Sequence, residues 1–144
     1  MRQVLGQLIC FAALACLLAS PSNAEMDRVY RSVRALSGKE IQVALFGRVN
    51  PKECKSLPLS EIHVITSPEH GSLTVRSATL TTNQYPGCPN LKLPAQVLLY
   101  KSVPNYVGSD LVSFTVTLEN GDMQAHRISI TVDKVGEPSK PEEL

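Results

Sequence analysis

Two runs of alternating residues flank a turn signal in residues 112–132, which read VSFTVTLENGDMQAHRISITV. The first run has an apolar side chain at every second position from Val112 to Leu118, and the second has one from Ile128 to Val132. A period of two is typical of a strand with one buried face. Asn120-Gly121 is a strong hairpin signal. Residues 112–132 therefore predict a β-hairpin.

The length of the turn decides which side chains lie opposite each other. A two-residue turn would place Phe114 opposite Arg127 and bring a charge onto the apolar face. A three-residue turn over 120–122 would place Phe114 opposite Ile128, so that both apolar faces coincide. We therefore expect the three-residue turn, with Gly121 or Asp122 at positive φ.

Shorter runs of the same kind precede the hairpin. In 41–46 the pattern places Ile41, Val43 and Leu45 on one face, with Phe46 on the other. Further strands are expected at 61–66, at 72–76 with Leu73 and Val75 inward, and at 95–101, an apolar strand expected to be covered on both faces. Segment 77–93 lacks a clear period and is expected to be a long loop. Six or seven short strands without a helical stripe predict an all-β antiparallel sandwich over residues 39–133.

The two ends of the chain differ from this pattern. In residues 25–38 Val29, Val33 and Leu36 fall at helical spacing, and a short helix or an irregular lead-in strand is expected there. Residues 134–144 are polar and rich in proline and glutamate, so a disordered tail is expected.

Residues 1–24 have the layout of a secretory signal peptide. Arg2 provides the positive start, 8–18 form the apolar core, and Ser22-Asn23-Ala24 supplies small residues for cleavage after Ala24. A membrane anchor would need about 20 apolar residues. A lipoprotein with acylated Cys16 is the other alternative, although Ala13 stands where such a signal has leucine. We expect a periplasmic or secreted protein without stable membrane insertion after cleavage.

Composition excludes some classes of partner. Without Arg2, 13 Lys and Arg balance 13 Asp and Glu. Because there is no basic stripe, the sequence argues against nucleic acid as a partner. No block of like charges points to a membrane surface either.

Cysteine usage agrees with export. Cys10 and Cys16 would leave with the signal peptide, and Cys54 and Cys88 would remain. In an oxidising compartment this pair predicts a disulfide, whose loop of roughly 35 residues is worth about 3–4 kcal/mol. Structural zinc would need four ligands, and a redox site would need a close Cys-x-x-Cys pair.

Two motifs resemble a known family. Residues 68–75 read PEHGSLTV and residues 100–110 read YKSVPNYVGSD, followed by Phe114-Thr115-Val116. They are similar to the bacterial Ig-like or cadherin-like repeat over about residues 41–132. The resemblance implies an Ig-like sandwich of about seven strands. The chain departs from the family in standing alone, in its Cys88 loop and in lacking the clustered acidic motifs that hold calcium in cadherins.

The second motif contains Tyr106, Gly108 and Asp110, which we interpret as a structural corner. Gly108 would permit a sharp bend before the strand, and Asp110 would cap the turned backbone. Tyr106 would pack its ring and bond its hydroxyl to main chain, as in a tyrosine corner.

Few residues suggest chemistry. We expect His63, His70 and His126 to have structural roles, since no Gly-x-Ser-x-Gly motif or other catalytic pattern accompanies them. Copper binding with Met26 or Met123 is disfavoured, because Met123 and His126 fall on opposite faces of one strand. Phe46, Tyr85 and Tyr106 could form an aromatic contact patch. No cofactor, metal or enzymatic activity is predicted.

The sequence therefore predicts a non-catalytic binding module. It would recognise an unknown protein or envelope polysaccharide through loops or an exposed sheet edge. The alternative is an inhibitor or accessory protein of a secreted hydrolase, in which the Cys88 loop enters the cleft of the enzyme.

Overall fold

The computed structural model describes residues 26–118 and 120–136. The predicted signal peptide, its cleavage site after Ala24, and residues 137–144 of the predicted tail lie outside the described residues. Within these ranges the protein is all-β, and no described segment is a helix long and apolar enough to cross a membrane.

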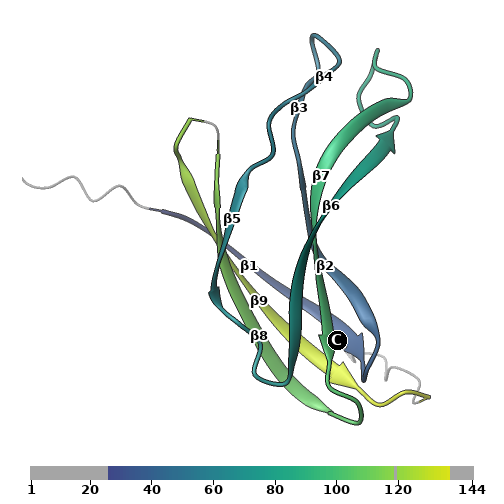
Figure 1. Cartoon of the computed structure of the whole chain (residues 1–144), viewed down its shortest axis with the longest axis vertical. Coiled ribbons are helices and arrows are strands. Elements are labelled where there is room, and N and C mark those ends of the chain that lie inside the picture. The colour runs from purple at the N-terminus through teal and green to yellow at the C-terminus, as the bar shows by residue number, and fades with distance from the viewer. Residues whose placement is uncertain (1–25, 119, 137–144) are drawn as a thin grey trace, which may run out of the picture.

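The described chain forms nine strands in three sheets (Figure 1). A four-stranded sheet has the order β1-β9-β8-β5, a three-stranded sheet the order β2-β7-β6, and β3 and β4 make a small ribbon. The bounds are Asp27–Leu36 for β1, Glu40–Gly47 for β2, Val49–Asn50 for β3, Lys55–Ser56 for β4, Glu61–Thr66 for β5, Gly71–Thr82 for β6, Leu91–Ser102 for β7, Gly108–Thr117 for β8 and Met123–Asp133 for β9.

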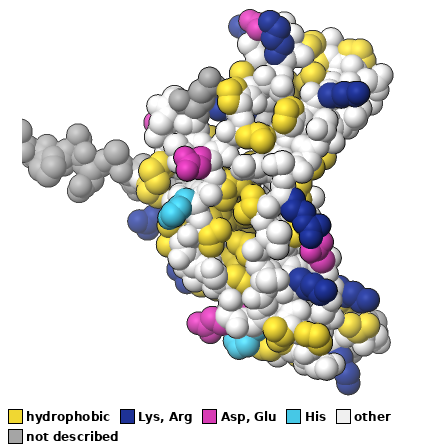
Figure 2. Space-filling view, in the orientation of Figure 1, with side chains coloured by type: hydrophobic (Ala, Val, Ile, Leu, Met, Phe, Trp, Pro, Cys, Tyr) yellow, Lys and Arg dark blue, Asp and Glu magenta, His cyan; other side chains and the backbone are white. Residues whose placement is uncertain are grey.

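The two larger sheets share one apolar core. Alternate residues of β8 and β9 fill it from one side, and Val43, Leu98 and Tyr100 fill it from the other. Figure 2 shows that the core is not closed all round, because hydrophobic side chains are visible in a hollow between the sheets. On the side seen in that view, β5 and β6 are the edges of their sheets.

The segment expected to be a helix or an irregular lead-in is the regular strand β1. It pairs in parallel with β9 over its whole length, from Asp27↔Gln124 to Leu36↔Asp133. The helical alternative is therefore wrong, and the sandwich begins at Asp27, well before the expected residue 39. The expectation of a purely antiparallel sandwich is also wrong, because β1 and β9 are parallel. Val33 and Ala35 pack inward from β1. Arg31 lies on the same face of the strand, although it is exposed, and this charged residue hides the alternation of apolar and polar residues in the sequence.

The expected faces of β2 are wrong beyond Gln42. The register with β7 shifts between Gln42 and Ala44, so that the chain has a β-bulge. Val43 and Ala44 are consequently both buried. Leu45 is 41% exposed, and Phe46 packs against the core.

The predicted long loop 77–93 is instead mostly part of a hairpin. β6 and β7 pair without interruption from Gly71↔Ser102 to Thr82↔Leu91, which leaves only 83–90 as the turn. Pro94 is tolerated because β2 ends at the pair Gly47↔Ala95, so at Pro94 β7 is paired on the β6 side and no longer with β2.

The buried face of the β6–β7 hairpin changes along its length. Leu93 and Ala95 are buried at odd positions of β7, whereas Leu98 and Tyr100 are buried at even positions. The outer half of the hairpin packs against the end of β2, since a Cβ on Gly47 would lie 3.1 Å from the Leu93 side chain. In 95–101 both faces are buried or half-buried as far as Tyr100, and Lys101 is exposed. Val75 was expected to face inward, but it is 41% exposed.

The terminal hairpin forms with its apolar faces as predicted but in a different register. Phe114 lies opposite His126, two residues from the expected Ile128. The N–H of Leu118 donates to the carbonyl of Asp122 at 2.8 Å, so the turn closes one position earlier than expected. Gly121 has a φ of +83°, as predicted for the turn.

Candidate binding surface

Asp110 lies at the start of β8 as a hub of hydrogen bonds. Its carboxylate accepts from the backbone N–H groups of Glu69 at 2.9 Å, His70 at 3.0 Å and Leu111 at 2.9 Å, and from the Tyr100 hydroxyl at 2.9 Å. Burial alone would raise its pKa, but these donors outweigh burial and lower the pKa of Asp110. Burial, followed by the bond to Asp110, raises the pKa of Tyr100.

Tyr106 and Gly108 form the adjoining corner. The Tyr106 hydroxyl donates to the carbonyl of Ser109 at 2.7 Å, and the His70 ring stacks on the Tyr106 ring with centroids 4.1 Å apart. Gly108 has a φ of +147°, and a Cβ there would lie 2.8 Å from the Tyr106 hydroxyl oxygen. The corner is therefore stabilised by the Tyr106 hydrogen bond, by the stacking of His70 on Tyr106, and by a glycine at position 108 that leaves room for the Tyr106 hydroxyl.

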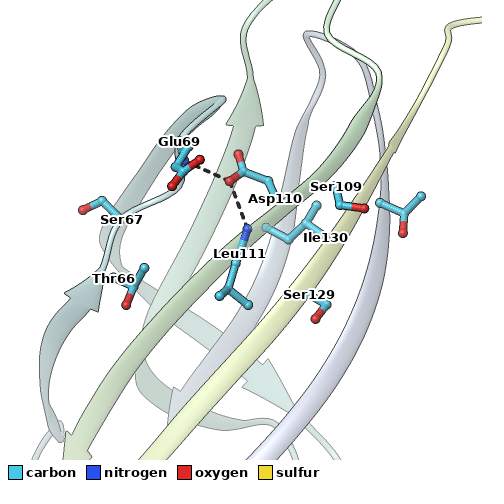
Figure 3. Close-up of a pocket in the computed structure, with 9 residues that line it drawn as sticks. Thr66, Ser67, Glu69, Ser109, Asp110, Leu111, Ser129 and Ile130 are labelled. Atoms are coloured by element: carbon cyan, nitrogen blue, oxygen red, sulfur yellow. Dashed lines mark hydrogen bonds between the residues drawn. The ribbon is translucent and has the colours of Figure 1, made fainter.

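A shallow pocket of about 350 Å³ lies beside this corner (Figure 3). Glu69 and Asp110 stand at its wall, with serine and threonine side chains around them. A carboxylate offers about four acceptor positions, and Asp110 uses its acceptor capacity on the four donors described above. Asp110 is therefore committed to the fold, and it is a poor ligand for a cation.

The three histidines lie apart from one another and have different environments. His63 is exposed on β5 and His70 stacks in the corner. His126 is buried, stacks on Phe114 with centroids 5.0 Å apart, and has its Nε2 2.8 Å from Oε1 of Gln124. Burial, with a smaller contribution from Arg31, lowers the pKa of His126. Within 26–118 and 120–136 no three His, Cys, Asp or Glu residues gather as a metal site.

The predicted disulfide is present and joins two loops. Cys54 follows β3 and Cys88 lies in the turn of the β6–β7 hairpin, with an S–S distance of 2.09 Å. Figure 1 places both loops at the same end of the molecule. Cys88 is buried, and Tyr85 beside it is half-buried. The bond therefore makes one tethered tip from two segments that are 34 residues apart.

Among the described residues, the aromatic side chain with the greatest exposed fraction is Tyr30, which lies elsewhere, on the outer face of the sheet β1-β9-β8-β5. Tyr30 is 66% exposed and lies beside Arg127 of β9, its partner in the parallel register. With Met26, Arg28 and Ile65 these residues line a groove of about 430 Å³. We call this group (Met26, Arg28, Tyr30, Ile65 and Arg127) the Tyr30 face. Ile65, at the bulge of β5, is 61% exposed.

The charge of the Tyr30 face is positive and unbalanced. Neither Arg28 nor Arg127 has an acidic side chain of the described chain within ion-pair distance. Farther along β1, Arg34 differs, since its Nε and Nη2 donate to the Asp133 carboxylate at 3.0 and 2.8 Å. The face thus combines an exposed ring, exposed apolar side chains and two guanidinium groups that have no acidic partner among the described residues. Aromatic, methionine and arginine side chains are enriched in protein interfaces.

Sequence reasoning missed this face and suggested a different aromatic patch. Phe46 packs on Phe114 and His126, Tyr106 stacks in the corner, and Tyr85 lies at the tethered tip, so these three do not meet. The sequence does contain a signal for this strand, because the polar residues Arg28, Tyr30 and Ser32 alternate with Val29 and Val33. It was obscured by Arg31, which occupies an inward position.

Comparisons with known proteins provide little further information. No family model and no curated protein matches the chain. Among solved structures, the solution structure of Amebosin is similar with a TM-score of 0.44 and 12% identity, over 75% of this chain and 98% of that one.

Proposed function

We propose that this protein is an exported, non-catalytic binding module with an Ig-like or cadherin-like β-sandwich fold. Its partner is an acidic segment of another protein, which contacts the Tyr30 face. The observation that carries the proposal is the exposed Tyr30 ring between Arg28 and Arg127, neither of which has an ion-pair partner in the described chain.

The strand order supports the sandwich assignment. If β1, β2, β5, β6, β7, β8 and β9 are lettered A to G, the sheets are A-G-F-C and B-E-D. The immunoglobulin arrangement has strands C, F and G in one sheet and A, B, E and D in the other. The two sheets agree with it except in strand A, which here pairs with G. Tyr106 stands just before the strand that would be F, where tyrosine corners occur, although its hydroxyl bonds to a carbonyl downstream.

The compartment is supported by the disulfide and by the predicted signal peptide. A persistent disulfide between Cys54 and Cys88 is typical of secreted or periplasmic proteins. The absence of enzymatic activity is supported by the roles of the best candidates for chemistry. Asp110 is saturated by hydrogen bonds, and His126 is buried against Phe114.

The acidic nature of the partner follows from charge complementarity. Guanidinium groups bind carboxylates in bidentate geometry, as Arg34 does with Asp133 on the same sheet. Arg28 and Arg127 line a groove whose walls also include the apolar side chains of Met26 and Ile65 and the ring of Tyr30. An acidic segment with an apolar or aromatic side chain would satisfy both features of the face.

A second function is favoured by the tethered tip. The disulfide restrains both loops, so a tip that enters the cleft of a secreted hydrolase would lose little conformational entropy on binding. Tyr85 in the Cys88 loop would then make the contact.

Site-specific photo-cross-linking separates the two proposals. The oxidised protein would carry p-benzoylphenylalanine in place of Tyr30 or, in the matched variant, in place of Tyr85, and would be irradiated with an envelope extract of its host. We expect a protein adduct from position 30 that disappears when Arg28→Glu and Arg127→Glu are added. An adduct only from position 85 would favour the inhibitor function. A glycan adduct from position 30, or an adduct insensitive to the charge reversals, would contradict an acidic protein partner.

A further inference from the structure

The two main sheets have four edge strands, and three of them carry features that oppose pairing with another chain. β1 presents the exposed Arg28, Arg31 and Arg34 along its length. β5 is only six residues long and its register is interrupted before Thr66. β2 has the bulge at Val43. Charges, short length and bulges are the usual protection of a sheet edge.

The fourth edge strand, β6, is neither short nor bulged, and it carries less charge than β1. It is 12 residues long and keeps one uninterrupted register with β7 from Gly71 to Thr82. It contains no proline and no lysine, and its one charged residue is Arg76. Threonine, valine and leucine suit a strand. β6 therefore offers a long, regular row of main-chain donors and acceptors to a further strand.

The middle of β6 is also uncovered on both of its faces. The four consecutive residues Thr74, Val75, Arg76 and Ser77 are all exposed, because the buried face of the hairpin changes sides there. Figure 2 shows the hollow with hydrophobic side chains between the sheets, on the side where β6 is an edge. A strand added to β6 would cover its free edge and approach this hollow.

An identical strand can pair with β6 in a register that brings no like charges together. In an antiparallel pair of two β6 strands around a two-fold axis normal to the sheet, residues of the same parity lie opposite each other. Two registers give the longest pairing: one is centred on Arg76 and the other on Ser77. The first places Arg76 opposite Arg76, which is destabilising. The second places Arg76 opposite Ala78, and no like charges meet.

We propose that β6 pairs with β6 of a second copy of this chain, antiparallel and centred on Ser77. The result is a dimer with one continuous six-stranded sheet in the order β2-β7-β6-β6-β7-β2. An unprotected edge strand is a template for pairing with another chain, and in the register centred on Ser77 an identical strand brings no like charges together. This inference is independent of the Tyr30 face, which lies on the other sheet.

Sedimentation velocity over a range of protein concentrations tests the dimer. The protein would be purified after export with the Cys54–Cys88 bond intact. We expect a concentration-dependent dimer that Ser77→Lys weakens about tenfold or more, because two lysines then meet at the axis. The control Ser32→Lys places the same change at an exposed position of β1 and should leave the dissociation constant unchanged. A monomer at all concentrations, or equal weakening by both variants, would overturn the proposal.

The register has its own test. In Ser77→Cys the two new thiols face each other across the axis, and opposed Cα atoms about 4.5–5.5 Å apart lie within the range of a disulfide. We expect a covalent dimer on mild oxidation, and none from Thr81→Cys, whose opposite residue in this register is Leu73. Arg76→Ser should change dimerisation less than about twofold, since like charges do not meet. Marked tightening would show the register centred on Arg76 and overturn the one proposed here.

Discussion

The hydroxyl of Tyr100 donates a hydrogen bond of 2.9 Å to the carboxylate of Asp110 within the core. Tyr100 belongs to β7 of the three-stranded sheet and Asp110 to β8 of the four-stranded sheet, so this bond connects the two sheets. The same carboxylate also holds the turn before β6 through the N–H groups of Glu69 and His70. One side chain thus fixes three segments relative to one another.

Replacing Asp110 should therefore be costly. Asp110→Ala leaves four donors without their acceptor, and we expect the free energy of unfolding to fall by about 3 kcal/mol or more. Tyr100→Phe removes one bond and should cost about 1 kcal/mol. Urea titration of both single variants and of the double variant measures the coupling. If Asp110→Ala costs no more than Tyr100→Phe, Asp110 does not hold the two sheets and the turn together.

Asp110 also predicts a loss of stability in acid. Its folded pKa is lowered from the ordinary value of 3.8 by the hydrogen bonds that outweigh burial. The unfolded chain therefore binds the proton first, so the stabilisation is complete above pH 3.8 and is lost as the pH falls through the lower folded pKa. Urea titrations from pH 7 to pH 2 should show a smaller loss for Asp110→Asn than for the unchanged protein. Equal losses would contradict this role.

His126 predicts a second pH effect at milder acidity. Burial is the main cause that lowers its folded pKa below 6.5, so the folded protein resists protonation of the ring. Stability is complete above pH 6.5 and declines as the pH falls toward the folded pKa. In His126→Phe the free energy of unfolding should change less between pH 7 and pH 5. His63→Gln alters an exposed histidine and serves as the control, which should keep the decline.

The disulfide should stabilise the fold substantially. Cys54→Ser combined with Cys88→Ser removes a link between residues 34 apart, and we expect a loss of about 3–4 kcal/mol. Hydrogen exchange should then accelerate most in the turn 83–90 and around β3 and β4. Uniform acceleration across β8 and β9 would instead indicate that the tip and the core unfold together.

Gly108 tests the corner. Gly108→Ala places a Cβ 2.8 Å from the Tyr106 hydroxyl at a φ of +147°, and we expect a loss of about 2 kcal/mol. In a Tyr106→Phe background the contact with the hydroxyl is gone, so Gly108→Ala should cost less. Thermal unfolding of the four proteins completes the cycle. A cost that does not depend on residue 106 would assign the whole effect to the backbone.

The periodic segments were predictable because each buries one face along its whole length. β8 and β9 keep Val112, Phe114, Ile128 and Ile130 on one side, and the sequence shows this directly. Their register was two residues off because both registers keep the same faces inward, and only the turn decides between them. The Cys54–Cys88 bond was predictable because the predicted signal peptide contains the other two cysteines, Cys10 and Cys16.

The remaining elements depend on contacts that a local pattern does not contain. β2 changes faces at a bulge next to Val43, and the β6–β7 hairpin changes faces near Gln96, so neither keeps one period. In β1 the inward position of Arg31 is tolerated because the strand is at an edge. The Tyr30 face depends on three features of the tertiary structure that the local sequence does not contain. β1 is a strand, β9 lies beside it, and the bulge in β5 exposes Ile65.

The parallel pairing of β1 with β9 has a consequence for the order in which the protein can be built. Asp27 and Gln124, which are joined by a 2.8 Å hydrogen bond, are 97 residues apart. At about 5–20 residues per second, a ribosome needs about 5–20 s to deliver the partner of β1 after β1 itself has emerged. Until β9 has emerged, β1 has no partner in the four-stranded sheet, so the first strand of the domain cannot pair before the last one is available.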